Sequence, residues 1–325
     1  MRINRPDEPA YSGLGTFMKT PLVLDAAELA GIDVAILGAP VDDLVTYRPG
    51  TRFGPREIRV ATDDSRPSAW HMDLGIDPFA HLKIVDNGDV GVVPLDAEGN
   101  LERIHDATAA IVAADAVPVV LGGDHSISYA TIRAVAARHP ELAVLHFDTH
   151  ADTATHNWGA KRAHGTPFRW LVEEGHLRGD RLVQIGLRGY WPEPAEFAWM
   201  RDAGVLWFRM EEVEERGYAD VIEAALSRVS DAEHLFLSID VDVLDPAFAP
   251  GTGTPEPGGM TTYQLFRMVR RAILAKGLAG MDVVEVSPPY DHAQVTAMAA
   301  HRLVLEALSS LAAHRIGHTP APENP

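Results

Sequence analysis

Eight short apolar runs recur along the chain, most of them bounded by glycine, proline, asparagine or aspartate. Runs of about four to eight apolar residues between such turn-forming residues are typical of buried strands. We therefore predict strands at residues 33–38, 82–86, 117–121, 144–152, 182–188, 205–208, 235–242 and 280–286.

The segments between these runs carry apolar residues at helical spacing. Leu101, Ile104, Thr108 and Ile111, for example, fall on one face of a helix at residues 101–114. Alternation of strands with helices indicates an α/β fold, in which helices cover both faces of a parallel sheet. A closed eight-stranded barrel has the same local rhythm, and periodicity does not distinguish it from an open sheet. Further helices are predicted at residues 128–138, 169–174, 218–227, 263–274 and 297–312.

No linker, internal repeat or low-complexity segment divides the chain. Its 325 residues exceed the length of an average domain, but α/β folds of this size are often single domains. We divide it into an N-terminal arm at 1–32, one α/β domain at 33–313 and a tail at 314–325. The tail contains three prolines and is expected to be disordered.

Metal-binding residue types follow the apolar residues of the fourth run. Asp148, His150 and Asp152 occupy alternate positions, and alternate side chains of an extended chain point to the same face. If the chain stays extended to Asp152, two carboxylates and an imidazole converge and suit a divalent cation. The structural alternative is a polar strand end that caps the following helix.

Two other strands end in the same residue types. Asp240 and Asp242 close the run at 235–242, and His125 follows the run at 117–121 after a Gly-Gly-Asp break. Functional groups of α/β proteins gather at the carboxyl ends of strands. Together with the first stretch, these segments offer four aspartates and two histidines, which suit two metal ions better than one.

Composition narrows the classes of partner. The chain has 46 acidic and 28 basic residues, for a formal net charge of −18. Nucleic acids and anionic membrane surfaces call for basic patches, so neither is expected, whereas a cationic substrate agrees with this charge. No run is long enough to span a membrane, no signal peptide is visible and there is no cysteine. We expect a cytoplasmic protein.

The ordered motifs resemble those of the ureohydrolase family, which contains arginase and agmatinase. The resemblance covers residues 15–310 and favours an open, doubly wound, mostly parallel sheet of about eight strands in a single-domain, three-layer α/β/α architecture. One departure is Thr149, where the family usually has alanine; this side chain is expected to point away from the metals. The matching motifs are YRPGTRFGP at 47–55, GGDHS at 122–126, DxHxD at 148–152, HGTPF at 164–168, SxDxDxxDP at 238–246, GTGTP at 251–255 and EVSP at 285–288.

The resemblance implies a centre of two Mn²⁺ ions per subunit, with Ni²⁺ or Co²⁺ as alternatives. In the family pattern, Asp148 and Asp240 bridge the two ions, and Asp148 is also counted among the catalytic residues. The implied ligands are His125, Asp148, His150, Asp152, Asp240 and Asp242.

The resemblance also implies roles for residues outside the ligand set. Glu285 would receive the guanidinium group and His164 would pass a proton to the leaving amine. Asn157, Tyr190 and Trp191 are candidates for substrate binding. Read as structural residues, Glu285 would be salt-bridged, His164 packed in a loop and the two aromatic residues buried at a subunit interface.

An amidinohydrolase that releases urea from a guanidino compound is the implied activity. Arginine is not the expected substrate, because Gly189 stands where arginases usually carry an aspartate. Agmatine, converted to putrescine, is the leading substrate because RPGTRFGP and HGT resemble the agmatinase branch. Guanidinobutyrate, guanidinopropionate, a proclavaminate-type compound and guanidine itself are the alternatives.

Two other functions fit the same motifs. A formiminoglutamase would share every metal ligand, but its acidic substrate requires a basic pocket residue such as Lys161 or Arg188. A non-catalytic family member is disfavoured because every expected metal ligand is present, together with His164 and Glu285. Members of the family assemble as trimers or hexamers, and we expect a homotrimer or a homohexamer here.

Four further polar residues are interpreted as structural. His146 precedes Asp148 within the apolar run and is expected to be a hydrogen-bonded core histidine. Asp124 is expected to lie outside the ligand set. Arg48 and Arg52, in the loop after the first strand, are expected to be ion-pair partners rather than substrate contacts.

Overall fold

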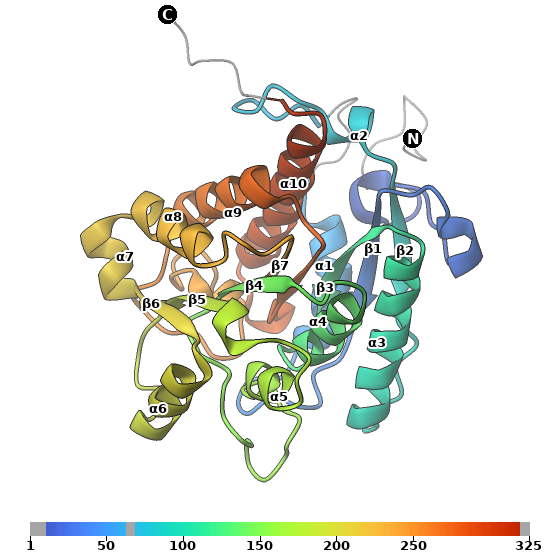
Figure 1. The fold of residues 1–325 in the computed structure, drawn as a ribbon. Helices are drawn as coiled ribbons and strands as arrows, with labels where there is room; N and C mark the ends of the chain where they lie inside the picture. The colour runs from blue at the N-terminus through green and yellow to red at the C-terminus, as the bar shows by residue number, and fades with distance from the viewer. Residues whose placement is uncertain (1–10, 63–68, 319–325) are drawn as a thin grey trace, which may run out of the picture.

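An open sheet of eight strands forms the centre of the molecule (Figure 1). In the computed structural model, residues 11–62 and 69–318 are described. The strands are β1 (Val34–Ala39), β2 (Ile84–Asp89), β3 (Val117–Gly122), β4 (Leu142–Phe147), β5 (Leu182–Leu187), β6 (Leu206–Arg209), β7 (His234–Asp240) and β8 (Gly280–Val284). Their order is β2-β1-β3-β8-β7-β4-β5-β6, and all neighbours pair in parallel. The predicted open sheet is confirmed, and the barrel is excluded.

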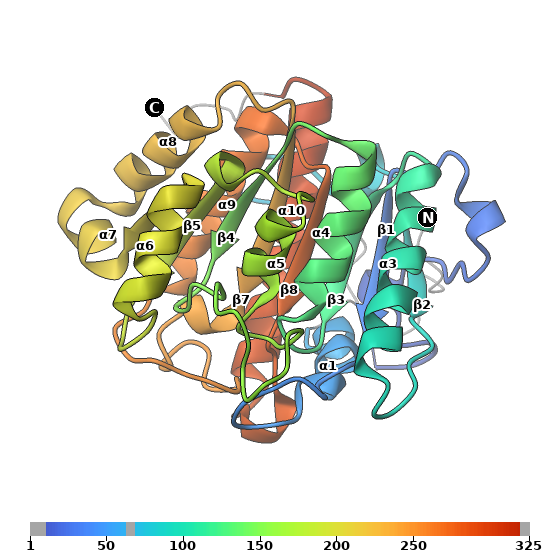
Figure 2. The same cartoon turned by 60° about the horizontal axis from the view of Figure 1, so that its bottom comes forward.

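Helices form a layer on each side of this sheet. Helices α3 to α6 cover one face, and α1 with α7 to α10 cover the other (Figure 2). The helices are α1 (Gly54–Val60), α2 (Pro78–His81), α3 (Ala97–Ala113), α4 (Ile127–Arg138), α5 (Pro167–Glu173), α6 (Pro194–Ala203), α7 (Met210–Arg216), α8 (Tyr218–Arg228), α9 (Thr262–Lys276) and α10 (Val295–Arg315). None of the described helices is long and apolar enough to cross a membrane.

The inner strands of the sheet are mostly apolar because both of its faces are covered by helices. Every residue of β3, β4 and β5 is buried, as expected for parallel strands between two helix layers. Successive side chains enter opposite cores: Val119 and Leu121 pack with the helices of one face, and Val120 packs with those of the other.

All six predicted helices are present, but four others were not predicted. Helices α1, α2 and α7 have seven residues or fewer, which is too short to establish a period. The equally short α5 was predicted because it follows the HGTPF motif. Helix α6 has ten residues, but only Met200 among them is buried, so its sequence shows no apolar stripe. The length and burial of a helix therefore decided whether its pattern could be recognised.

The strand order brings separated parts of the sequence together. The four central strands, β3, β8, β7 and β4, are neighbours in the sheet although they come from distant parts of the chain. Because all are parallel, their carboxyl ends lie side by side at one edge. These ends precede the segments that hold His125, Glu285, Asp242 and Asp148.

The structure describes part of the N-terminal arm and the beginning of the predicted tail. In the arm, Phe17 is fully buried, stacks on His301 of α10 and donates its N–H to the Asp86 carboxylate of β2. The described part of the arm thus packs on the domain at Phe17. Helix α10 continues to Arg315, past the predicted end of the domain, and residues 319–325 of the predicted tail lie outside the described residues.

A buried ion pair joins α1 to β2 and the arm. Arg59 donates from Nε to Asp86 Oδ2 at 2.8 Å and from Nη2 to Asp86 Oδ1 at 3.0 Å. The same carboxylate accepts the Phe17 N–H at 2.8 Å. One buried carboxylate therefore connects three segments of the fold.

Replacing Arg59 with methionine should leave Asp86 buried without its cation. Breaking a buried pair in this way costs about 3–5 kcal/mol. Urea denaturation followed by tryptophan fluorescence measures the loss in the free energy of unfolding. The matched control is Arg178→Met, because the Arg178–Asp180 pair lies at the surface. Equal effects of the two substitutions would contradict the role given to Arg59.

Candidate metal centre

Strands β4 and β7 end in sharp turns that begin at predicted ligands. The Asp148 carboxylate accepts the His150 N–H at 2.6 Å, and Asp240 accepts the Asp242 N–H at 2.8 Å. Each first aspartate thus closes a local turn that ends its strand. The predicted extension to Asp152 is wrong, since β4 ends at Phe147 and Asp152 has a positive φ of 51°. The side chains converge through turns rather than by strand alternation.

A first group of ligands surrounds one ring nitrogen of His125. Its Nδ1 lies 2.9 Å from Asp152 Oδ2, 3.0 Å from Asp148 Oδ2 and 3.3 Å from Asp240 Oδ2. This nitrogen is buried, yet none of the three oxygens takes a hydrogen bond of good geometry from it. A buried nitrogen among three carboxylate oxygens without a hydrogen bond indicates a missing electrophilic partner.

A second group adjoins the first through Asp148. His150 Nδ1 lies 3.1 Å from Asp242 Oδ2 and 3.5 Å from Asp148 Oδ1. The two oxygens of Asp148 therefore face different groups, which is the arrangement of a bridging carboxylate. Asp240 differs, because a histidine nitrogen lies beside its Oδ2 in the first group, whereas none of the described histidines is paired with its Oδ1.

Crowding of negative charge shifts the pKa values of these carboxyl groups. Burial and repulsion from Asp242 and Asp148 raise the pKa of Asp240 well above its usual range. Burial and the charge of Asp148 raise the pKa of Asp242 to about 6. Burial opposes ionisation of Asp148 as well, but contacts with His146 and His125 hold its pKa well below its usual range. Cations bound among these groups would remove the repulsion.

The donor set fits two divalent ions. Ligand atoms about 3 Å apart are what a cation with bonds of about 2.1 Å holds at neighbouring positions. Carboxylate oxygens with one imidazole in each group suit Mn²⁺ and neighbouring transition metals. All six predicted ligands are brought together, in two groups that share Asp148, and His146 also lies within the first group.

Hydrogen-bonded partners that were not predicted orient the ligands. His125 Nε2 lies 3.1 Å from the hydroxyl of Ser238, which donates at 2.7 Å to the buried Asp282. Such partners fix the ring orientation and tautomer of a metal-binding histidine. The signal for Asp282 was present in the sequence as a carboxylate inside the apolar run of β8. His146 is fully buried, and its two nitrogens contact Asp148 and Gln184, as expected for a core histidine.

Glu285 follows β8 and presents one unpaired oxygen. Its φ of 65° is unusual for a glutamate and turns the chain away from the sheet. Its Oε1 accepts the His125 N–H at 2.9 Å and lies 3.0 Å from His164 Nδ1. Its Oε2 is buried without a partner among the described residues, and Gly253 leaves that side open. The structural alternative of a surface salt bridge does not describe this residue, because Glu285 is buried and its ion-pair partner among the described residues is His164.

His164 is buried between two loops. Its Nδ1 faces Glu285, and its Nε2 lies 2.7 Å from the hydroxyl and 3.1 Å from the N–H of Thr46. Burial lowers the pKa of His164, but Glu285 and nearby carboxylates outweigh this effect and raise it to about 9. The ring is thus held at both nitrogens. Thr46 was not among the predicted residues.

The three residues predicted to bind substrate occupy different surroundings. Asn157 accepts the Gly165 N–H at 3.1 Å, so its side chain braces the loop that carries His164. Tyr190 and Trp191 are 88% and 64% exposed in the single chain. Neither aromatic ring is packed in the core.

The two arginines of the loop after β1 differ in their contacts. Arg52 binds Asp42 and Asp43, which confirms its expected structural role. Arg48 lies 5.2 Å from the ring centroids of both Tyr47 and Tyr290, without an ion pair or hydrogen bond to any described residue, so its predicted pairing is wrong.

The two bases considered for an acidic substrate are both occupied. Lys161 donates to Glu174 at 2.8 Å. Arg188 donates to the backbone carbonyls of Asp242 at 2.7 Å and Glu256 at 2.6 Å.

Comparisons with known proteins agree with this geometry. A family model described as "Arginase family" matches residues 32–309. The guanidinobutyrase of Pseudomonas aeruginosa is 39% identical over 93% of this chain and 94% of that protein. The mitochondrial agmatinase of Gallus gallus is 38% identical over 92% of this chain and 86% of that protein. The solved structure of proclavaminate amidino hydrolase from Streptomyces clavuligerus has a TM-score of 0.88 and 35% identity, covering 94% of this chain and 100% of that one.

Metal content tests the two ligand groups. After manganese loading and removal of free ions, the wild-type chain should retain two ions per subunit by plasma mass spectrometry. Asp242→Asn should retain about one, because the first group is left intact, and Asp148→Asn should lose both. The control is Asp245→Asn, since Asp245 belongs to the same motif but binds backbone N–H groups. Two ions retained by Asp148→Asn would contradict the shared ligand.

Proposed function

The chain belongs to the arginase family and is a guanidino-compound amidinohydrolase, and we propose that agmatine is its preferred substrate and that the six clustered ligand residues form its reaction centre. The identity values alone do not select the substrate, because relatives of 39% and 38% identity carry different substrate names. The substrate is therefore argued from the residues around the centre.

The six clustered residues are proposed to hold two divalent ions, with Mn²⁺ as the first choice. Two such ions, when bound, lower the pKa of a shared water and so supply a nucleophile at neutral pH. The chain contributes the anionic surroundings and fixes them, because Ser238 orients His125 and His146 contacts Asp148.

Glu285 is proposed to bind the guanidinium group, and its unpaired oxygen is the observation that carries the proposal. A buried carboxylate oxygen without a donor is costly unless a ligand supplies one. Guanidinium offers planar N–H donors that match a carboxylate in charge and geometry. Because Oε1 is already bound by His125 N–H, the free Oε2 presents itself toward a ligand beside the cluster.

His164 is proposed to give a proton to the departing amine. The ring contacts Glu285, so it lies next to the site where the guanidinium would be held. Its raised pKa keeps it protonated near neutral pH, which a proton donor requires. After donation the ring is neutral and must regain a proton before the next turnover.

The carboxylate of Glu256 favours agmatine, because the end of agmatine opposite its guanidinium is an ammonium group. The side chain of Glu256 lies against Gly189, where a Cβ would stand 3.0 Å from its Cδ. This carboxylate makes neither a hydrogen bond nor an ion pair with the described residues. Arg188 ties its backbone to that of the predicted ligand Asp242, which fixes Glu256 near the centre.

A guanidino acid is the second candidate, and the unpaired Arg48 favours it. Its guanidinium lies between two tyrosine rings in the loop after β1. The Arg48 carbonyl oxygen and Glu285 Oε2 both border Gly253, at 3.1 and 3.4 Å from the position of an added Cβ. A carboxylate tail could therefore meet Arg48 while the guanidinium meets Glu285. Lys161 and Arg188, the two bases considered for a formiminoglutamase, are both occupied and offer no site for its acidic substrate.

Removing the charge of Glu285 tests the guanidinium site. Glu285→Gln should lower kcat/KM for urea release by about 10- to 100-fold, because a charge-assisted hydrogen bond contributes about 1.5–3 kcal/mol. Manganese content should stay at two per subunit. The matched control is Glu223→Gln, an exposed glutamate paired with Arg271. Unchanged kcat/KM in Glu285→Gln would contradict the assigned role.

A substrate panel with two variants tests the tail. Urea release is measured with agmatine, arginine, 4-guanidinobutyrate, 3-guanidinopropionate and guanidine. We expect agmatine to be preferred, with Glu256→Gln raising its KM about tenfold or more and Arg48→Met leaving it unchanged. Preference for a guanidino acid, with the effects of the two variants reversed, would replace agmatine. Preference for guanidine would also contradict agmatine and would favour Tyr190 and Trp191 as the substrate contacts.

A further inference from the structure

We propose that Thr46 is a positioning residue that holds the His164 ring and lets it alternate between its two protonation states. The proposal rests on the proposed function, since it concerns the residue assigned to proton transfer. Thr46 belongs to the loop after β1 and lies outside every motif that holds a metal ligand.

The contacts of the His164 ring carry the proposal. Glu285, after β8, holds Nδ1 at 3.0 Å, and Thr46, after β1, holds Nε2 through its hydroxyl at 2.7 Å and its N–H at 3.1 Å. With both nitrogens bound from opposite sides, the ring has one orientation. Among the described residues, Thr46 supplies both hydrogen bonds at Nε2.

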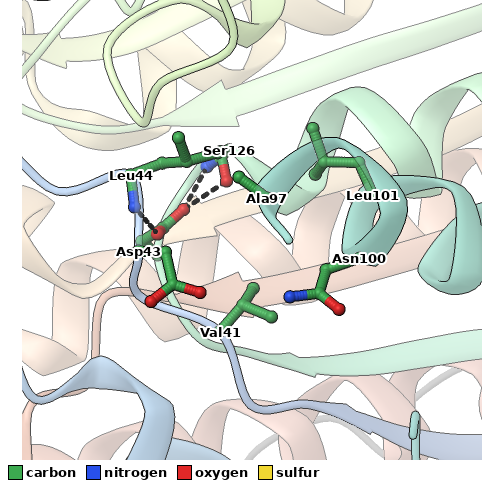
Figure 3. A pocket seen from close by; sticks show the side chains of 8 residues that line it. Val41, Asp43, Leu44, Ala97, Asn100, Leu101 and Ser126 are labelled. Carbon is green, nitrogen blue, oxygen red and sulfur yellow. Dashed lines mark hydrogen bonds between the residues drawn. The ribbon is translucent and has the colours of Figure 1, made fainter. Parts of the chain in front are cut away.

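The loop that carries Thr46 is itself anchored to the site. Leu44 accepts the His164 N–H at 3.2 Å. It donates its own N–H to Asp124 Oδ2 at 3.2 Å, and Figure 3 shows this bond as a dashed line from Leu44. The other oxygen of Asp124 accepts the N–H and hydroxyl of Ser126, next to His125. The cavity under this loop is only about 10 Å³, so it holds at most one water. The backbone of His164 and the loop that carries Thr46 are therefore bonded to each other, and Asp124 holds that loop.

A second anchor holds the far side of the loop. The Asp42 carboxylate accepts the Gly50 N–H at 2.7 Å and a bond from Arg52 Nε. Thr46 lies between this anchor and the one at Asp124. The short contact to His164 thus comes from a segment that is bound at both ends.

The hydroxyl of Thr46 serves both states of the ring. A backbone N–H can only donate, so it favours a neutral ring whose Nε2 carries a lone pair. A hydroxyl can donate to the neutral ring and accept from the protonated one. Glu285, Asp152 and Asp124 are the carboxylates that favour the proton on His164. Without the hydroxyl, the N–H of residue 46 would oppose that proton with no acceptor to offset it.

Valine and serine substitutions separate the hydroxyl from the shape of the side chain. Thr46→Val should lower kcat for urea release about tenfold or more, the scale of impaired acid–base catalysis, with KM changed less than about twofold. Thr46→Ser should retain most of kcat. Both variants should keep two manganese ions per subunit and the wild-type melting temperature. Wild-type kcat in Thr46→Val would overturn the proposal.

A spectroscopic measurement keeps this test independent of turnover. The ring nitrogens of His164, assigned in ¹⁵N NMR spectra by comparison with His164→Asn, report tautomer and hydrogen bonding. Thr46→Val should shift the Nε2 resonance, and Thr46→Ser should restore it. An unchanged resonance would overturn the proposal even if no guanidino compound released urea. Absence of urea from the wild type with the expected shift would instead overturn only the proposed function.

Discussion

Mutual repulsion of buried carboxylates is the constraint on which the site depends. Asp148, Asp240 and Asp242 are nearly inaccessible to solvent, and burial with repulsion raises the pKa of the last two. Such an assembly is unfavourable without positive charge among its members. His125 and His150 stand within the cluster and point ring nitrogens at the same oxygens. The structure is therefore built around cations, and the surrounding hydrogen bonds keep the ligands ready for them.

The sheet makes this concentration of charge possible. Strands β3, β8, β7 and β4 are adjacent in the order of the sheet, and each ends at the same edge. The apolar strands supply the buried surface that stabilises the domain, while their carboxyl ends supply the chemistry. Arg188 joins the segments after β5 and β7 through backbone carbonyls, and Asp124 joins those after β1 and β3. The loops are thus held without using the charges that face the centre.

Much of this arrangement could be predicted from the residues, and the exceptions have physical causes. Apolar runs identified all eight strands, and the motifs identified the six residues that converge. Periodicity could not show that Asp148 and Asp240 end their strands by accepting a nearby N–H, because such turns depend on side-chain geometry. Contacts between distant segments, such as Ser238 with His125 and Thr46 with His164, require the strand order. The pairing expected for Arg48 failed because its guanidinium lies beside the rings of Tyr47 and Tyr290, and the contact with Tyr290 joins two distant segments.

The electron paramagnetic resonance spectrum of the manganese-loaded protein tests the central claim most directly. Asp148 faces both ligand groups with different oxygens, so two Mn²⁺ ions bound there share a ligand and must be magnetically coupled. The account predicts the multiline spectrum of a spin-coupled pair at two ions per subunit. A six-line spectrum of isolated Mn²⁺ at the same stoichiometry would contradict a shared centre.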